Sequence, residues 1–328
     1  MLLLSKKDIE QVFTMKDAIE ADKKAFKLAI DKKVDIPLRT KIDEQKNDGE
    51  FLFMPAYCAD IDAAAVKIIN IFPHNIDNGL VSCPAQVLLI DANTGYVVAV
   101  LDGDQVTKMR TGASSGAAFD LLAKKECHIG GMIGTGGQAI TQLEAMLTAR
   151  KLDEVRIFDL NKERCEQFCA EMQEKFASYG TKIKPAASSD EAIEEADVII
   201  TVTPSPKPVF DGKKVKKGAT ISCVGTYEPH KHEMDPAILP RASKIICDFK
   251  EAALEETGDL LIPMKDGIIS ESDILGSLGE VINGTILGRE NDEEIIVYET
   301  VGIAAQDLFA AKEIYDKAVA LGKGTQWE

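Results

Sequence analysis

A glycine-rich turn near the middle of the chain constrains its fold more than any other feature. Residues 127–133 read as a short apolar strand, which runs into the sequence Gly-Thr-Gly-Gly-Gln-Ala at 134–139. Gly134, Gly136 and Ala139 occupy the fixed positions of the pattern G-x-G-x-x-G/A. The first glycine permits a tight turn, the second lets the backbone approach a pyrophosphate, and the small third residue lets a helix pack on the strand. We therefore predict a strand, turn and helix that hold dinucleotide phosphates at the helix N-terminus.

A second strand follows, and the residue at its end bears on which dinucleotide is bound. Residues 155–159 read Val-Arg-Ile-Phe-Asp, and Asp159 lies 20 residues past Ala139. A carboxylate at this place accepts from the 2′-hydroxyl of the adenosine ribose and repels the 2′-phosphate of NADP. The next two residues are uncharged, although Lys162 and Arg164 are close. The sequence therefore favours NAD as the cofactor over NADP.

Strands and helices alternate through this half of the chain. Such alternation is typical of a parallel sheet with right-handed crossovers, a doubly wound fold of the Rossmann type. We expect strands at 128–133, 155–159, 182–186, 197–203, 219–224 and 243–248, and helices at 138–150, 162–178 and 189–195. Loops that follow the fourth and fifth strands lie at the carboxyl edge, beside the cofactor. The predicted cofactor-binding residues are Gly134, Thr135, Gly136, Gly137, Gln138, Ala139, Asp159, Thr203, Val224 and Gly225.

The remainder of the chain has a different pattern. A helix is predicted at 8–32, where apolar residues fall broadly on one helical face. Between residues 36 and 101, short strand-like runs are separated by turn sequences, which is typical of an antiparallel sheet. These runs lie at 51–54, 64–71, 86–90 and 96–101, a small-residue helix follows at 112–124, and a last helix at 302–321 is apolar on one side. The fold class is therefore α/β, a Rossmann-type doubly wound parallel sheet plus a smaller α+β domain.

Composition excludes several classes of partner. The 328 residues carry 38 basic and 54 acidic side chains, a formal net charge of −16 that argues against nucleic acid and anionic membranes as partners. No run approaches the ~20 apolar residues of a membrane span, and the N-terminus lacks the pattern of a signal peptide. The seven cysteines have no C-x-x-C spacing and are expected to be free thiols in a reducing compartment. We expect a cytoplasmic protein without a metal site.

Three cations in the first part of the chain form a second candidate site. Lys67 lies in an apolar strand between Val66 and Ile68. A lysine among apolar neighbours is costly unless it reaches water or finds a partner. Arg39 precedes a strand and Arg110 opens the small-residue helix, where a guanidinium can make a bidentate pair with a carboxylate. Spacing alone does not show that the three cations converge.

Several short motifs resemble those of one known family. They run along nearly the whole chain, and the blocks Met109–Ala113 and Ile133–Ala139 are the most specific. The sequence resembles the ornithine cyclodeaminase and mu-crystallin family, which includes ketimine reductases and archaeal-type alanine dehydrogenases. The other matching stretches are Met54–Tyr57, Lys67 with Phe72–Asn75, Asn78–Leu80, Leu89–Asp91 with Thr94–Gly95, Leu101–Gly103, Val106–Thr107, Leu278–Val281, Val301–Ala304 and Gln306–Leu308.

The resemblance implies both an assembly and a substrate site. It implies a homodimer in which residues 1–124 and 303–328 form the substrate-binding and dimerisation domain, while residues 125–302 bind NAD. It also implies that Arg39, Lys67 and Arg110 grip the substrate carboxylate near the nicotinamide, and that Ser82 lies close to the substrate. Three cations suit an α-amino or α-imino acid, and fixed donors hold its reacting carbon in line for hydride transfer.

Two departures from the family pattern bear on the reaction. Ornithine cyclodeaminase proper has a Glu where this chain has Leu52, and a catalytic Asp that aligns with Tyr227. Losing both carboxylates argues against ornithine cyclisation. Tyr227 or Glu228 is a candidate proton donor to an imine or amine, the alternative being that both are loop residues on the rim. Together with Lys67, they make up the predicted catalytic residues.

Three functions therefore remain open. The first is an NAD-dependent oxidoreductase on small α-imino or α-amino acids, either a reductase of ketimines such as Δ1-pyrroline-2-carboxylate or an enzyme like alanine dehydrogenase. The second is an ornithine or lysine cyclodeaminase, in which NAD is catalytic and no net NADH appears. The third is a nucleotide-dependent binding protein similar to mu-crystallin. The intact set of three cations argues against the third.

Overall fold

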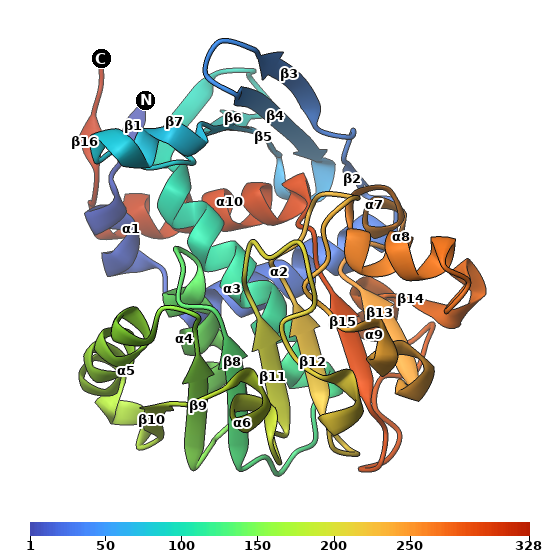
Figure 1. Cartoon of the computed structure of the whole chain (residues 1–328). Coiled ribbons are helices and arrows are strands. Elements are labelled where there is room, and N and C mark those ends of the chain that lie inside the picture. The colour runs from blue at the N-terminus through green and yellow to red at the C-terminus, as the bar shows by residue number, and fades with distance from the viewer. The chain divides into compact units, whose positions relative to one another are not determined.

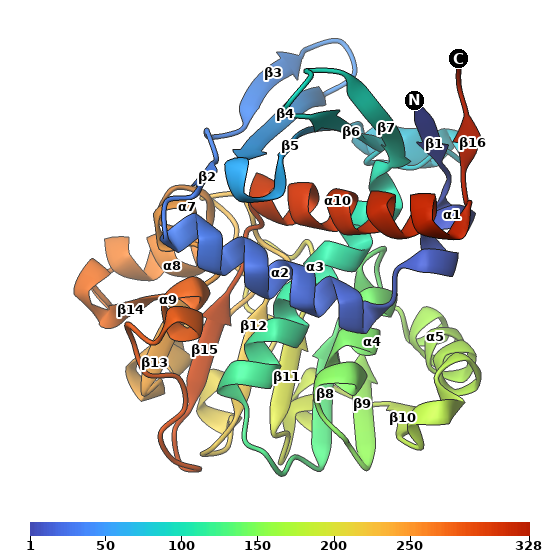
Figure 2. The ribbon, with the colours of Figure 1, turned by 180° about the vertical axis from the view of Figure 1, so that it is seen from behind.

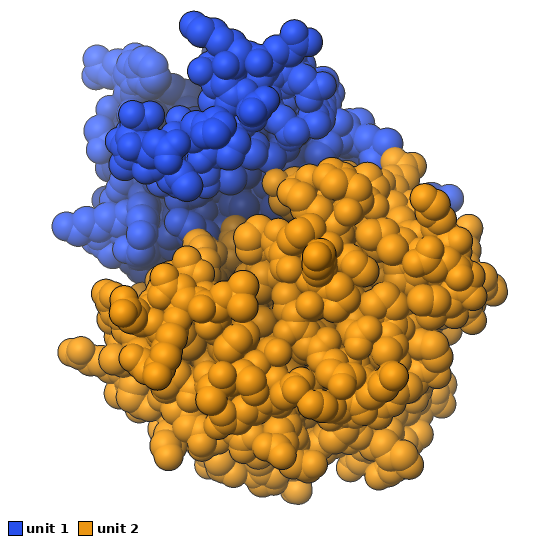
Figure 3. Space-filling model, viewed as in Figure 1, with its two compact units in different colours: residues 1–110, 303–328 blue, residues 111–302 orange.

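The computed structural model describes all 328 residues, which form two compact units (Figure 3). Unit 1 comprises residues 1–110 and 303–328, and unit 2 comprises residues 111–302. The chain passes from unit 1 into unit 2 within helix α3 (Gly103–Leu122), which begins nine residues before the helix predicted at 112–124. None of the helices has both the length and the apolar character that a membrane-spanning helix requires.

Unit 2 is built on an eight-stranded parallel sheet (Figure 1). The strands are β8 (Ile129–Ile133), β9 (Glu154–Phe158), β10 (Lys182–Pro185), β11 (Val198–Thr201), β12 (Thr220–Cys223), β13 (Lys244–Cys247), β14 (Ile274–Ser277) and β15 (Ile296–Glu299). Their order is β10-β9-β8-β11-β12-β15-β13-β14, and every pairing is parallel. The predicted Rossmann-type sheet is confirmed, with six of its strands. The sequence analysis missed β14 and β15.

Two separate apolar cores cover the faces of this sheet, as a doubly wound fold requires. Neighbouring residues of β8 show the alternation, since Met132 belongs to one core and Ile133 to the other. The core at Met132 includes side chains of α3, α4 (Ala139–Ala149) and α5 (Lys162–Lys175). The core at Ile133 includes side chains of α6 (Ser189–Ile193), α7 (Lys250–Glu256) and α8 (Gly258–Lys265). A short helix, α9 (Leu278–Asn283), follows β14.

Unit 1 is built on a second sheet, and its four central strands are antiparallel as predicted. These are β4 (Gly49–Cys58), β5 (Ala63–Ile71), β6 (Ala85–Asp91) and β7 (Val97–Asp102). The sequence analysis did not identify the edge strands. They are β1 (Leu2–Leu4), parallel to β7, β16 (Thr325–Gln326), antiparallel to β1, and β2 (Val34–Asp35) and β3 (Thr40–Glu44), both antiparallel to β4.

Three helices complete unit 1. The prediction of one helix over 8–32 is wrong in its continuity, because the chain forms α1 (Lys6–Val12) and α2 (Met15–Ile30). Thr14 separates them, since its hydroxyl accepts from the Asp17 amide while its own amide donates to the Asp17 carboxylate. This reciprocal cap starts a new helix. The last helix, α10 (Ala304–Leu321), packs against α2 and against β4, β5 and β6 (Figure 2).

Asp197 is the main electrostatic link between the starts of β8 and β11. One carboxylate oxygen accepts from the amides of His128 (2.7 Å) and Ile129 (3.1 Å), and the other lies 2.9 Å from the Lys124 ammonium and 2.8 Å from that of Lys216. Burial opposes the charge, but hydrogen bonds from Lys216, the His128 amide and Lys124 hold the pKa of Asp197 well below its usual range.

We expect Asp197→Asn to lower the free energy of unfolding by about 2–3 kcal/mol, because it leaves two partly buried ammonium groups without their counter-ion. Urea denaturation followed by circular dichroism measures the change. The matched control is Asp153→Asn, whose carboxylate pairs with the His128 ring and is 74% exposed. Its effect should stay below about 0.5 kcal/mol, and equal effects of the two variants would contradict the assignment.

Candidate active site

The glycine turn after β8 is closely packed at its first residue and open at the next two. Gly134 has a φ of +110°, and a Cβ there would lie 2.5 Å from the Val202 carbonyl oxygen. Only glycine fits such a position. A Cβ at Gly136 or Gly137 would meet nothing within 4 Å. The turn therefore lies tightly against the end of β11 and leaves its other side open for a ligand.

The N-terminus of α4 fits an anion. Ala139, the first residue of the helix, is fully buried, and the preceding Gln138 makes no side-chain capping hydrogen bond. Uncapped amides and the positive end of the helix dipole favour a phosphate at such a terminus. Together with the open side at Gly136 and Gly137, these residues fit the pyrophosphate of a dinucleotide.

Asp159 lies immediately after β9, where the sequence analysis placed it, and its carboxylate is surrounded by donors. The amide and hydroxyl of Thr135 donate to one oxygen (2.9 and 2.6 Å), and the amide of Asn161 donates to the other (2.8 Å). One terminal nitrogen of Arg164 lies 2.7 and 2.8 Å from the two oxygens. Burial opposes ionisation, but these hydrogen bonds lower the pKa of Asp159 below its ordinary value.

A buried glutamate that the sequence analysis did not identify fixes the two loops expected beside the cofactor. Glu233 accepts hydrogen bonds from the Thr201 hydroxyl, the amide and hydroxyl of Thr203, and the Gly225 amide, all at 2.7–2.8 Å. Its carboxylate thus joins the loop after β11 to the loop after β12, with Val224 beside it. Burial raises the pKa of Glu233, although these hydrogen bonds oppose the rise.

Two further buried carboxyl groups lie near Glu233. The Cys223 sulfur and one carboxylate oxygen each of Asp259 and Glu299 all lie within 4.8 Å of one another. Burial, and then the charge of Glu233, raise the pKa of Asp259 to about 7. Burial and the neighbouring Asp259 raise the pKa of Glu299 well above its ordinary value. Burial therefore disfavours the charged forms of these carboxyl groups.

The structure brings Lys67 and Arg110 together around one carboxylate. Lys67 on β5 is fully buried, and its ammonium lies 2.8 and 3.0 Å from the two oxygens of Asp307 on α10. The Arg110 Nε lies 3.2 Å from the same carboxylate. Gln306, beside Asp307, accepts from Arg110 (3.3 Å) and donates to Asp22 (2.7 Å).

The pKa of Lys67 is far below that of an ordinary lysine. Burial, and then the charge of Arg110, lower the pKa of Lys67 from its ordinary 10.5 to about 7, although Asp307 opposes the shift. The charge of Arg39 adds to the lowering, so this half-buried side chain also acts on Lys67. An anion bound beside these basic side chains would favour the charged form of Lys67 and raise its pKa.

The remaining predicted site residues are Ser82, Tyr227 and Glu228. Ser82, half-buried in the segment before β6, accepts the Phe72 amide through its carbonyl (2.8 Å). Tyr227 and Glu228 belong to unit 2, in the loop after β12. The Tyr227 side chain is exposed, while the Glu228 carboxylate lies 2.6 Å from the Lys231 ammonium and 3.2 Å from the His230 ring.

The sequence held a signal for Asp307 that the analysis did not use. Gln306 and Asp307 are the polar pair in the otherwise apolar run Ala304–Ala311. A charged side chain in such a run is as unusual as Lys67 in its strand. Each of the two needs an oppositely charged partner if it is buried. Glu233 has no comparable signal, because its segment is polar throughout.

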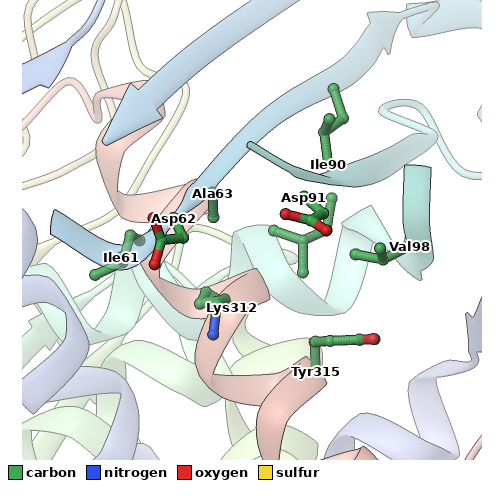
Figure 4. A pocket seen from close by; sticks show the side chains of 9 residues that line it. Ile61, Asp62, Ala63, Ile90, Asp91, Val98, Lys312 and Tyr315 are labelled. Atoms are coloured by element: carbon green, nitrogen blue, oxygen red, sulfur yellow. The ribbon is translucent and has the colours of Figure 1, made fainter. Parts of the chain in front are cut away.

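A cavity of about 250 Å³ lies elsewhere in unit 1 (Figure 4). Lys312 and Tyr315 of α10 line it, together with Asp62 and with Asp91 and Ile90 of β6. None of the predicted site residues lines this cavity. It is therefore separate from the group formed by Lys67, Arg110 and Asp307.

The fold and these two sites define a Rossmann-type α/β protein with a second, antiparallel unit that buries a cation cluster. Residues 1–322 match the ornithine cyclodeaminase/mu-crystallin family, and the chain belongs to it. It is 36% identical to a Δ1-pyrroline-2-carboxylate reductase of Bacillus cereus over the full length of both chains.

Two solved structures are similar over nearly the whole chain. That of the Δ1-pyrroline-2-carboxylate reductase of Thermococcus litoralis, in complex with NADH and L-proline, is 39% identical, covers both chains fully and has a TM-score of 0.94. An archaeal alanine dehydrogenase dimer with bound NAD is 33% identical, covers 100% of this chain and 99% of its own, and has a TM-score of 0.91.

We expect Lys67 to titrate near pH 7 rather than 10.5, and Asp307→Asn to lower its pKa further because the variant removes the one close anion. NMR of lysine labelled at Cε measures both pKa values.

The shift also affects stability. The unfolded chain binds the extra proton between about pH 7 and 10.5, so the contribution of Lys67 to stability rises with pH across that window. Asp104→Asn, which removes the partner of the half-buried Lys108, should leave the titration unchanged. A wild-type midpoint near 10.5 would contradict the electrostatic account.

Proposed function

We propose that this protein is an NAD-dependent reductase of small α-imino acids, with Δ1-pyrroline-2-carboxylate as the first candidate substrate. The observation that carries the proposal is the buried group of Lys67 and Arg110 around Asp307. The similarity to two Δ1-pyrroline-2-carboxylate reductases supports it, as does the presence of L-proline, the product of that reduction, in one of them.

Unit 1 supplies the anchor for the substrate. Lys67 and Arg110 both lie at the Asp307 carboxylate, and the charge of Arg39 acts on Lys67. A substrate carboxylate would be attracted to these basic side chains. Charge-assisted hydrogen bonds from ammonium and guanidinium groups fix such a carboxylate in direction as well as in place. Orientation of this kind is what hydride transfer to a planar carbon requires.

Unit 2 supplies the cofactor site. The turn at Gly134–Gly137 and the N-terminus of α4 take the pyrophosphate, Asp159 lies at the adenosine end, and Glu233 stiffens the loops that carry Thr203 and Gly225. When bound, NADH supplies the hydride that adds to the imine carbon. The imine nitrogen then needs a proton. Lys67, with a pKa of about 7, can hold one at neutral pH.

The surroundings of Lys67 argue against a cyclodeaminase. Met54 of β4 pairs directly with Lys67 of β5, and Leu52, two residues away, lies buried on the same face. Leu52 occupies the position of the cyclodeaminase glutamate, so this side of the cation cluster is apolar. An apolar wall suits the ring carbons of a cyclic imino acid better than the second amino group of ornithine.

The test follows NADH absorbance with Δ1-pyrroline-2-carboxylate, and separately with pyruvate plus ammonia. Loss of NADH with the cyclic imine establishes the proposed reductase, and loss only with pyruvate and ammonia points to a reaction like that of alanine dehydrogenase. Ammonia released from ornithine with catalytic NAD⁺, and no net NADH, would mark a cyclodeaminase. Tight NADH binding without turnover of any substrate would mark a binding protein.

We expect Lys67→Met to lower kcat/KM for the imino acid by roughly 100-fold or more, because it removes both a carboxylate ligand and a proton store. Steady-state kinetics measures the loss, and NADH fluorescence should show cofactor affinity changed by less than about threefold. Lys108→Met, which removes a half-buried lysine of α3 that pairs with Asp104, is the matched control and should retain activity. A fully active Lys67→Met enzyme would exclude the proposed anchor.

We propose further that the protein is a cytoplasmic homodimer. Its seven cysteines are all free thiols, as is usual in a reducing compartment. One face of the sheet in unit 1 packs on α10, whereas the other carries apolar side chains that are only half-buried. These include Phe51, Phe53, Val66, Ile68, Leu88 and Val100. A contiguous apolar face of this kind is typical of a protein interface, and the similar archaeal alanine dehydrogenase is a dimer.

We expect Ile68→Asp to convert the dimer into a monomer, because it places a charge in the centre of the apolar face. Light scattering coupled to size-exclusion chromatography gives the mass directly. Leu275→Asp, at an exposed apolar position of unit 2, is the control and should leave the mass unchanged. A wild-type mass of one chain, 35.6 kDa, would refute the dimer.

A further inference from the structure

Three buried carboxyl groups lie together in unit 2 without a basic partner. Glu299 ends β15 and is the register partner of Cys223, which ends the neighbouring strand β12 (Figure 1). Asp259 lies in the first turn of α8, and Glu233 lies between β12 and β13. All three carboxyl groups are fully buried, and none of them forms an ion pair. Their charge must therefore be offset by hydrogen bonds or by protons.

Glu233 has the partners of an ionised carboxylate. Each of its oxygens accepts a hydrogen bond of 2.7 Å from a backbone amide, that of Gly225 on one oxygen and that of Thr203 on the other. Protonation would turn one oxygen into a donor that faces an amide, and an amide N–H can only donate. A Cβ at Gly225 would lie 2.7 Å from this carboxylate and 2.1 Å from the Thr203 carbonyl oxygen. The two loops are therefore closely packed around a negative charge.

Asp259 and Glu299 have the partners of protonated acids. One oxygen of Asp259 accepts from the Met234 amide (2.8 Å), and one oxygen of Glu299 accepts from the Thr257 hydroxyl (2.9 Å). The second oxygen of each side chain is buried without a partner. Oxygens of the two carboxyl groups lie within 4.8 Å of each other. A proton on one of them can therefore be donated towards the other, which removes the cost of a buried unpaired charge.

The titratable groups that act on this pair from neighbouring elements are all acidic. Burial, and then the charge of Glu233, raise the pKa of Asp259 to about 7. Burial, and then the charge of Asp259, raise the pKa of Glu299 well above its ordinary value. The pKa of Glu233 rises against opposition from its hydrogen bonds. The surrounding acidic groups are the carboxyl groups of Glu233 and Asp248 and the thiols of Cys223 and Cys247.

We propose that Asp259 and Glu299 are positioning residues for the cofactor: at neutral pH and below they keep their protons, and the negative charge of this core stays on Glu233, which holds the loops of Thr203 and Gly225. The inference rests on the proposed function, because it takes these loops to lie beside NADH. Ionisation of Asp259 places a second negative charge near Glu233 and favours a proton on Glu233, which opposes its hydrogen bonds from the amides. The affinity for NADH therefore falls as the pH rises through the pKa of Asp259.

The experiment titrates the full-length protein with NADH in a pH series, followed by NADH fluorescence. In the wild type we expect the dissociation constant to rise by about tenfold between about pH 6.5 and 8.5. Asp259→Asn cannot ionise, yet its amide group still accepts from Met234 and donates towards Glu299. It should lose most of this pH dependence and bind NADH about fivefold more tightly than the wild type at about pH 8.5. Asp266→Asn, at the exposed C-terminal end of α8, is the matched control and should keep the wild-type profile.

Two further variants and one spectrum exclude other origins of the pH dependence. Glu233→Gln makes the same chemical change at the neighbouring group, and it should weaken NADH binding by about tenfold at every pH, because it places a donor against a donor. Lys67 also has a pKa of about 7, but Lys67→Met should keep the wild-type profile. Infrared difference spectra of the wild type should show the loss of a protonated carboxyl group over the same pH range, which tests the account without any substitution.

The outcomes separate this inference from the proposed function. An NADH affinity of the wild type that does not depend on pH would overturn the positioning role alone. So would a pH dependence that Asp259→Asn retains or that Lys67→Met abolishes. A protein that binds no NADH at any pH would overturn both the inference and the proposed function.

Discussion

The buried ammonium of Lys67 constrains how the elements of unit 1 pack. Lys67 is fully buried in a strand, and a lysine removed from water needs a counter-charge. Asp307 supplies it from 240 residues further along the chain, so α10 must pack on β5 for the sheet of unit 1 to be stable. Arg110 and Arg39 oppose the charge on this ammonium while Asp307 supports it, and with burial they lower the pKa of Lys67 to about 7.

Unit 2 could be predicted from local sequence, because the residues that determine its fold lie close together along the chain. The turn at Gly134–Ala139 needs glycine for reasons of backbone geometry, and the strand before it and helix after it follow from short-range periodicity. Asp159 was also predictable, since one helix and one strand separate it from the turn. Lys67 could be singled out from its apolar neighbours alone.

The partners of these residues could not be predicted in the same way. Asp307 neutralises Lys67 only because α10 packs on β5, a tertiary contact that no local pattern encodes. Glu233 acquires its role from donors in two loops that the parallel sheet brings to one edge. Short strands such as β15 were missed, yet β15 lies between β12 and β13 in the sheet. Side-chain pairing across the fold, rather than local propensity, decides these features.

The division of the chain has a consequence for its synthesis on the ribosome. Unit 2 is one uninterrupted segment, residues 111–302, whereas unit 1 combines the first 110 residues with the last 26. Domains fold as units while the chain emerges from its N-terminus. The middle of this chain therefore has its complete set of strands before Asp307 has been translated. Until then the first sheet lacks both the counter-ion of Lys67 and the helix that covers one of its faces.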